Sequence, residues 1–148
     1  MYKRLAIWTI AVLFSVSFFG CATSSFTDFK PASTDEKNIY ATMSGMADCR
    51  DRGDVKGYMS YIHKDAKIRP GGRDQNIVSK EEYLPIIKKQ FADGVKTPWA
   101  TAPKMKVSGD KAEVEIWAAV PEHPRGGITM SFLIVRENGK WLIIRQDY

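Results

Sequence analysis

The spacing of apolar residues changes along this chain, from a helical pattern in its first part to strict alternation in its last. Across residues 112–120 every second residue is apolar, and Glu113, Glu115 and Trp117 stand between them. Such alternation predicts a strand with one buried face. Residues 128–136 are apolar on both faces, as in a central strand, and Asn138-Gly139 predicts a hairpin turn into a last strand. The end of the chain is therefore predicted to form an antiparallel sheet.

The part before this sheet is predicted to be helical. Ser33 and Glu36 fit a capping box, and apolar residues follow at spacings of three and four. Gly53 predicts the end of this helix, a short helix over residues 55–62 follows, and Ser79 opens a third helix. Helices followed by a meander of strands predict an α+β fold, with the helices packed on one face of the sheet.

The first 20 residues have the layout of a secretory signal. Lys3 and Arg4 precede an apolar run over residues 5–19, and the segment contains no acidic residue. The run is shorter than the ~20 residues that a transmembrane helix needs. The following Gly20-Cys21-Ala22 resembles the lipobox of bacterial lipoproteins, in which cleavage before the cysteine leaves it to carry diacylglycerol and palmitate. Phe18 and Phe19 depart from that motif, which usually has Leu and a smaller residue at these positions.

The chain is thus predicted to have three parts. Residues 1–20 are the signal peptide, residues 21–34 the lipidated Cys21 and a flexible tether, and residues 35–148 a single domain. Cleavage after Ala22 by an ordinary signal peptidase, or retention of the segment as an uncut anchor, remain alternatives. In each case the domain is exported, and the predicted location is the outer membrane, facing the periplasm, with Cys21 as the membrane contact.

Charge and metal-ligating residues exclude several functions. The chain has 22 basic and 17 acidic residues, and removal of residues 1–20 leaves 20 and 17, a net charge of +3. The basic residues form no cluster, so no nucleic-acid partner is expected. The two histidines, His63 and His123, lack ligand spacing, so no metal and no cofactor are expected. Cys49 is predicted to be a buried side chain on a helix.

The order of these elements resembles the nuclear transport factor 2-like, or SnoaL-like, superfamily over residues 35–148. The resemblance rests on four features: Arg52-Gly53-Asp54 between two helices, the step His63-Lys64-Asp65-Ala66-Lys67-Ile68 into a first strand, the capped helix at Ser79, and Gly139-Lys140-Trp141 at the last strand. It implies a curved antiparallel sheet wrapped with helices into a cone, with a pocket at the open end. The superfamily includes isomerases, dehydratases, hydrolases and non-enzymatic binding modules, so the fold does not decide the chemistry.

Few residues stand out as candidates for a site in such a cone. His63 and Asp147 are weak catalytic candidates, and neither has a catalytic partner that spacing identifies, so no catalytic residue is assigned. Alternation along the last strand places Arg145 and Asp147 on one face with Trp141 and Ile143, either in the pocket or at a solvent-exposed strand end. The predicted ligand pocket consists of Tyr58, Tyr61, Trp99 and Arg145.

Three functions follow from these observations. The first is a membrane-anchored domain that binds a small apolar ligand or an envelope partner without catalysis. The second is a lyase, isomerase or hydrolase that uses an acid or base in the pocket. The third is a structural envelope protein that forms a homodimer through the outer face of its sheet.

Overall fold

Three helices lie against a six-stranded sheet in the computed structural model, which describes residues 25–71, 76–95, 98–120 and 125–148. The helices are α1 (Thr34–Arg52), α2 (Val55–Ser60) and α3 (Lys80–Ala92), preceded by a 3₁₀ turn, η1 (Phe26–Asp28). The strands are β1 (Ile62–Ile68), β2 (Val78–Ser79), β3 (Lys104–Ser108), β4 (Lys111–Ala119), β5 (Gly127–Glu137) and β6 (Lys140–Asp147).

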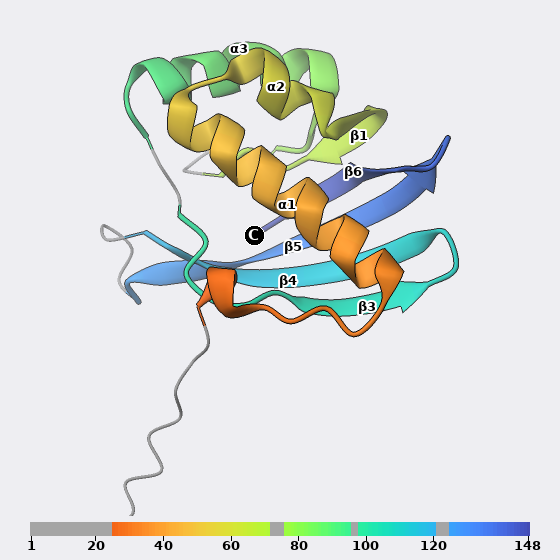
Figure 1. The fold of residues 1–148 in the computed structure, drawn as a ribbon. Helices are drawn as coiled ribbons and strands as arrows, with labels where there is room; N and C mark the ends of the chain where they lie inside the picture. Colours follow the sequence, from red (N-terminus) through yellow and green to blue (C-terminus); the bar gives the residue numbers. More distant parts are fainter. Residues whose placement is uncertain (1–24, 72–75, 96–97, 121–124) are drawn as a thin grey trace, which may run out of the picture.

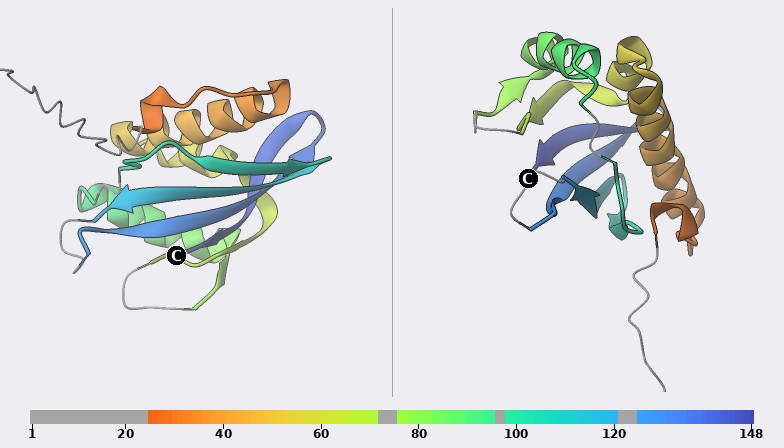
Figure 2. Two further views of the ribbon diagram at one scale, coloured as in Figure 1. Left: turned by 90° about the horizontal axis from the view of Figure 1, so that it is seen from below. Right: turned by 90° about the vertical axis from the view of Figure 1, so that its left-hand side faces the viewer.

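The sheet has the order β2-β1-β6-β5-β4-β3 and curves around α1, which lies diagonally across its inner face (Figure 1). The helices α2 and α3 lie beside β1, so that the sheet and helices form an open cone (Figure 2). The predicted α+β cone is therefore confirmed. One pairing differs from the prediction, because β1 and β6 are parallel. The two strands are far apart in the chain, and no hairpin constrains them to be antiparallel.

The helices α1 and α3 begin directly after their predicted capping residues, Ser33 and Ser79. The Ser33 hydroxyl accepts a hydrogen bond from the amide of Glu36 at 3.1 Å, and Ser79 and Glu82 form a reciprocal capping box. Gly53 ends α1 in the left-handed conformation, with a φ of 70°. The short helix α2 ends at Ser60, two residues before the predicted end, because Ile62 already belongs to β1.

The strands follow the predicted alternation. Along β4 the even-numbered residues are buried against the helices and the odd-numbered residues face outward. Asn138 and Gly139 both have positive φ, at 50° and 76°, as the predicted two-residue hairpin turn requires. The inner face of β4, β5 and β6 thus forms a continuous apolar layer under α1.

Cys49 is buried on the inner side of α1, as predicted. Burial raises the pKa of its thiol, and the nearby carboxylate of Asp54 raises it further. The environment of Cys49 therefore disfavours the reactive thiolate.

The segment before α1 differs from the predicted flexible tether. The ring of Phe26 packs against Tyr40 and Trp99, with centroid distances of 5.2 and 5.4 Å, and Phe29 also packs on Tyr40 at 5.3 Å. The Tyr40 hydroxyl donates a hydrogen bond to the carbonyl of Phe26. Two aromatic residues in a segment without periodicity are sufficient to hold it on the domain. No helix in the described parts of the chain is long and apolar enough to cross a membrane.

The contact between α1 and the start of β1 depends on a glycine. A Cβ atom built on Gly45 would overlap the Tyr61 hydroxyl and would lie 2.7 Å from the adjacent ring carbon. Gly45→Ala is therefore expected to lower the free energy of unfolding by about 1–2 kcal/mol, although alanine is the better helix former. Urea denaturation measures the change.

The matched controls use the same contact. Ser44→Ala, one residue earlier on α1, adds no atom and should leave stability nearly unchanged. Tyr61→Phe combined with Gly45→Ala should recover part of the loss, because it removes the overlapping hydroxyl. A Gly45→Ala protein as stable as the original would show that α1 and Tyr61 are not in this contact.

Candidate functional site

The open end of the cone contains a small hollow of about 40 Å³. Its walls come from every layer of the fold: Tyr58 from α2, Tyr83 and Ile87 from α3, Trp99 from the segment before β3, and Gln146 from β6. A cavity needs roughly 10–15 Å³ to hold one water molecule, so this hollow has room for a few waters or one small polar group. Most of the cone is filled by the protein's own side chains.

A chain of hydrogen bonds surrounds this hollow. The Gln146 amide nitrogen donates to the Tyr148 hydroxyl at 2.9 Å, and Tyr148 in turn donates to the carbonyl of Pro70 at 3.3 Å. The buried hydroxyls of Tyr83 and Tyr58 lie close to Gln146 and to each other. Together these groups form the polar network of the hollow.

The three tyrosines are neutral at physiological pH. Burial is the main cause that raises the pKa of Tyr58 and of Tyr83 well above the usual range of the phenol. Burial of its hydroxyl also raises the pKa of Tyr148, although 40% of that residue's surface is exposed at the rim. These hydroxyls act as hydrogen-bond donors or acceptors and carry no charge.

Arg50 brings a positive charge to the wall of the hollow. Its guanidinium lies 5.2 Å from the centre of the Trp99 ring and forms an ion pair with Asp51 at 3.0 Å. Only 10% of the Arg50 side chain is exposed. The cation–π contact with Trp99 holds the guanidinium of Arg50 beside the last turn of α1.

A β-bulge in the last strand decides which residues face the hollow. Ile143 pairs with Ile134 and Arg145 pairs with Leu133, so Ile144 is an extra residue in β6. The extra residue reverses the alternation beyond it. The buried inward residue near the end of β6 is consequently Gln146, which simple alternation from Trp141 and Ile143 does not predict.

Arg145 and Asp147 therefore do not share the face of Trp141 and Ile143, and this prediction is wrong. They lie on the outer side of the sheet and form an ion pair at 2.7 Å, and Asp147 also contacts Arg69 at 3.4 Å. Arg145 lines a separate shallow groove that includes Glu113 and Glu115.

The other predicted site residues are divided between the hollow and distant positions. Tyr58 and Trp99 both line the hollow, whereas Tyr61 lies against Gly45 of α1. His63 is buried; its Nδ1 accepts the amide of Asp65 at 3.1 Å and its Nε2 lies 3.1 Å from a carboxylate oxygen of Glu137. This pair connects β1 to the β5–β6 turn. His123 and Cys21 lie outside the described residues.

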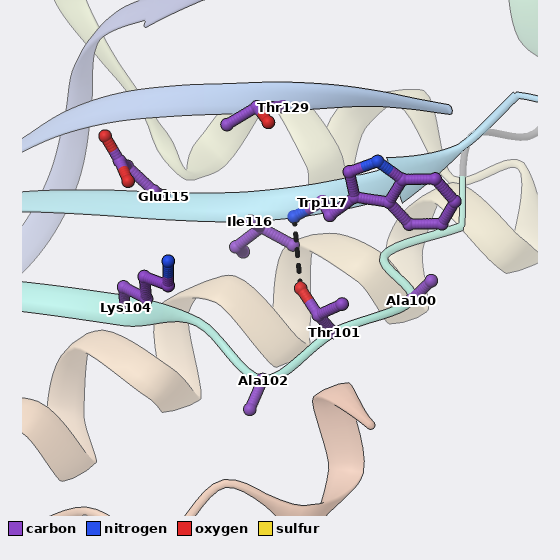
Figure 3. A pocket seen from close by; sticks show the side chains of 8 residues that line it. All are labelled: Ala100, Thr101, Ala102, Lys104, Glu115, Ile116, Trp117 and Thr129. Atoms are coloured by element: carbon purple, nitrogen blue, oxygen red, sulfur yellow. Dashed lines mark hydrogen bonds between the residues drawn. The ribbon is translucent and has the colours of Figure 1, made fainter. Parts of the chain in front are cut away.

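A second, larger depression lies on the outer face of the sheet (Figure 3). It occupies about 700 Å³ over β4, where Trp117 and Glu115 point outward beside Thr129 of β5. The amide of Trp117 donates to the Thr101 hydroxyl at 3.2 Å, and Lys104 is the cross-strand partner of Glu115. This depression is open, and its residues are not linked into a polar network like that of the hollow.

The described side chains of the hollow offer hydrogen-bond donors and acceptors. They include no side-chain carboxylate and no imidazole, and no group of three or more metal-ligating residues occurs in the described parts of the chain. A proton-transfer enzyme needs a group with a pKa near the working pH. The arrangement is suited to binding an uncharged polar group.

Solved structures share this fold. A protein of unknown function with a cystatin-like fold from Nostoc punctiforme is 17% identical, with a TM-score of 0.62 over 80% of this chain and 92% of its own. A nuclear transport factor 2-like protein of unknown function from Pseudomonas putida is 14% identical, with a TM-score of 0.62 over 76% of this chain and 83% of its own. A proposed dehydratase of that family from Streptomyces avermitilis is 14% identical. Its TM-score is 0.61, over 76% of this chain and 93% of its own.

These likenesses establish the nuclear transport factor 2-like fold, as the sequence resemblance predicted. No family model matches the sequence, and no curated protein matches it in a sequence comparison. At these identities the neighbours indicate the architecture of the cone and leave its ligand open.

The buried tyrosines predict a loss of stability in alkali. Unfolding returns the Tyr58 and Tyr83 hydroxyls to a pKa of about 10, so above this pH the unfolded chain releases protons that the folded chain retains. The free energy of unfolding should fall by about 1.4 kcal/mol per pH unit for each of them.

Tyr83→Phe should remove one such contribution and make the decline above pH 10 shallower. Urea denaturation at intervals from pH 7 to 11 measures both slopes. Between pH 7 and 9 the free energies of unfolding of the two proteins should differ by a constant amount, and this constant difference serves as the internal control. Parallel curves up to pH 11 would contradict the burial of the Tyr83 hydroxyl.

Proposed function

We propose that this chain is an exported lipoprotein whose domain binds a small amphipathic molecule in the hollow of the cone without transforming it. The observation that carries the proposal is the group of buried polar side chains formed by Tyr58, Tyr83 and Gln146, which lies beside a small free volume in the cone. Buried polar groups with convergent positions are typical of a site that orients a ligand.

The size and the rim of the hollow indicate how such a ligand lies. A volume of about 40 Å³ admits one polar group, so the rest of the molecule must lie at the mouth. The mouth is apolar: Val95 and Tyr148 are 50% and 40% exposed there, and Phe91 is half-buried between α3 and the hollow. Burial of an apolar chain on these residues would supply affinity at about 25 cal/mol per Å².

The described N-terminal segment supports a position close to the membrane. Phe26 is packed on Trp99, and only three residues lie between Cys21 and Ser25. The four steps from one Cα to the next between Cys21 and Ser25 span at most roughly 14 Å. If Cys21 carries the lipid, the wall of the hollow formed by Trp99 stands near the headgroups, where amphipathic molecules are concentrated.

Lipidation of Cys21 is tested by metabolic labelling with a palmitate analogue. The full chain should incorporate the label and fractionate with membranes, and Cys21→Ala should lose both properties because the acceptor thiol is absent. Cys49→Ala is the matched control and should keep both, since Cys49 is buried on α1. Normal labelling of Cys21→Ala would contradict the lipoprotein assignment, and an unlabelled full chain that remains in membranes would indicate an uncut anchor.

Binding in the hollow is tested by filling it. Ile87→Phe adds atoms at the wall of the hollow and should abolish binding of five- to ten-carbon alcohols and amides, measured by nuclear magnetic resonance titration of the detergent-solubilised full chain. Ile86→Phe is the matched control, because Ile86 is the preceding residue of α3 and does not line the hollow. Equal binding by both variants would place the ligand elsewhere.

The outer depression favours a second function, homodimerisation through the sheet. It combines the outward-facing ring of Trp117 with the oppositely charged side chains of Lys104 and Glu115, which are opposite each other in the sheet. Native mass spectrometry of the same preparation distinguishes the two functions. A dimer without bound small molecules would favour the structural function, and a monomer with a bound small molecule would favour the pocket function.

A further inference from the structure

One buried polar atom at the hollow has no partner within the described structure. Gln146 is 1% exposed, and its side-chain oxygen Oε1 accepts no hydrogen bond. A buried acceptor left unpaired is unfavourable, so such an atom requires an explanation. The other such atom, Nε1 of Trp141, belongs to a residue that does not line the hollow.

The hydrogen-bond network fixes which end of the Gln146 amide is unpaired. Tyr148 uses its single proton on the carbonyl of Pro70, so its oxygen can only accept from Gln146. The Gln146 group that meets Tyr148 must therefore be the nitrogen, Nε2. The unpaired group is therefore the oxygen, Oε1, of a residue that lines the hollow.

We propose that the ligand presents an uncharged hydrogen-bond donor, a hydroxyl or an amide N–H, to Oε1 of Gln146. This inference rests on the proposed function, because it names the class of molecule that the hollow would accept. A carboxylate would place a lone pair against the lone pairs of Oε1. An ammonium group would stand in the wall that already holds the cation of Arg50.

The site should strongly prefer ligands that carry a hydrogen-bond donor. A site built to hydrogen-bond a hydroxyl or N–H group rejects an analogue without it, because the buried protein group is then left unpaired. The neutral hydroxyls of Tyr58 and Tyr83 lie in the same network and keep the surroundings of Oε1 free of negative charge. The preference for a donor should therefore persist across the physiological pH range.

A pair of isomers tests this inference in the full chain, solubilised in detergent. Pentan-1-ol and butyl methyl ether have the same composition, and only the alcohol carries a donor. Pentanoate is the anionic probe of similar length. Dissociation constants come from nuclear magnetic resonance titration, followed at the Gln146 side-chain amide and the Trp99 indole, which both belong to the wall of the hollow.

The alcohol is expected to bind at least about tenfold more tightly than the ether, and more tightly than pentanoate. Gln146→Met removes the acceptor and should bring the ratio between alcohol and ether close to one. Gln90→Met is the matched control: Gln90 also lines the hollow, but it is not the residue with the unpaired buried oxygen, and its amide nitrogen donates to the carbonyl of Pro70 at 3.5 Å, so the ratio should be preserved. The ratio in the unmodified chain is decisive by itself if Gln146→Met does not fold.

The remaining outcomes separate the two proposals. Equal affinities for alcohol and ether, with shifts at Trp99 and Gln146, would overturn the donor inference and leave the binding function standing. That result would mean that a retained water satisfies Oε1. Tighter binding of pentanoate would also overturn the inference, by assigning recognition to Arg50. Absence of any shift at the hollow with all three probes would overturn the proposed function itself.

Discussion

At Ile144 the last strand contains one residue more than its neighbour, and the composition of the cone's interior depends on this bulge. Before it, Ile143 faces inward opposite Ile134; beyond it, Gln146 faces inward opposite Phe132. Without the extra residue, the strand would place Arg145 and Asp147 in the interior, and two opposite charges would require desolvation there. With the extra residue, the ion pair between Arg145 and Asp147 lies on the outer side of the sheet, and the neutral amide of Gln146 lies in the interior. The polar network of the hollow is built on that amide.

Much of the fold is encoded locally, and those parts were predictable. Capping residues define the start of α1 and α3, alternation defines β4, and Asn138-Gly139 defines the hairpin. The bulge has no such local signal, because Ile143 and Ile144 are both apolar and either could face the core. The parallel pairing of β1 with β6 is likewise set by the packing of elements distant in sequence.

The candidate site was less predictable than the fold for a related reason. Tyr58 and Trp99 were identified as aromatic wall residues, yet the sequence offers no reason to place Arg50, Tyr83 or Gln146 beside them. Arg50, Tyr83 and Gln146 come from three separate elements, α1, α3 and β6, and only tertiary packing brings them together. Trp99 also shows how the N-terminal segment joins this arrangement, since Phe26 packs on the same indole that borders the hollow. A segment read as a tether thus contributes to the support of the site.

The chemistry of the hollow separates recognition from catalysis. Proton abstraction in a cone of this kind requires a base that is deprotonated at neutral pH, and desolvation moves the pKa of each buried tyrosine in the opposite direction. The same desolvation makes each hydrogen bond in the hollow more selective, because a mismatched polar group loses water without gaining a partner. A small site lined by buried polar groups is therefore well suited to distinguishing ligands by one hydrogen bond. Desolvation of the buried tyrosines would therefore weaken this chain as an enzyme, and the same desolvation would give it specificity as a binding protein.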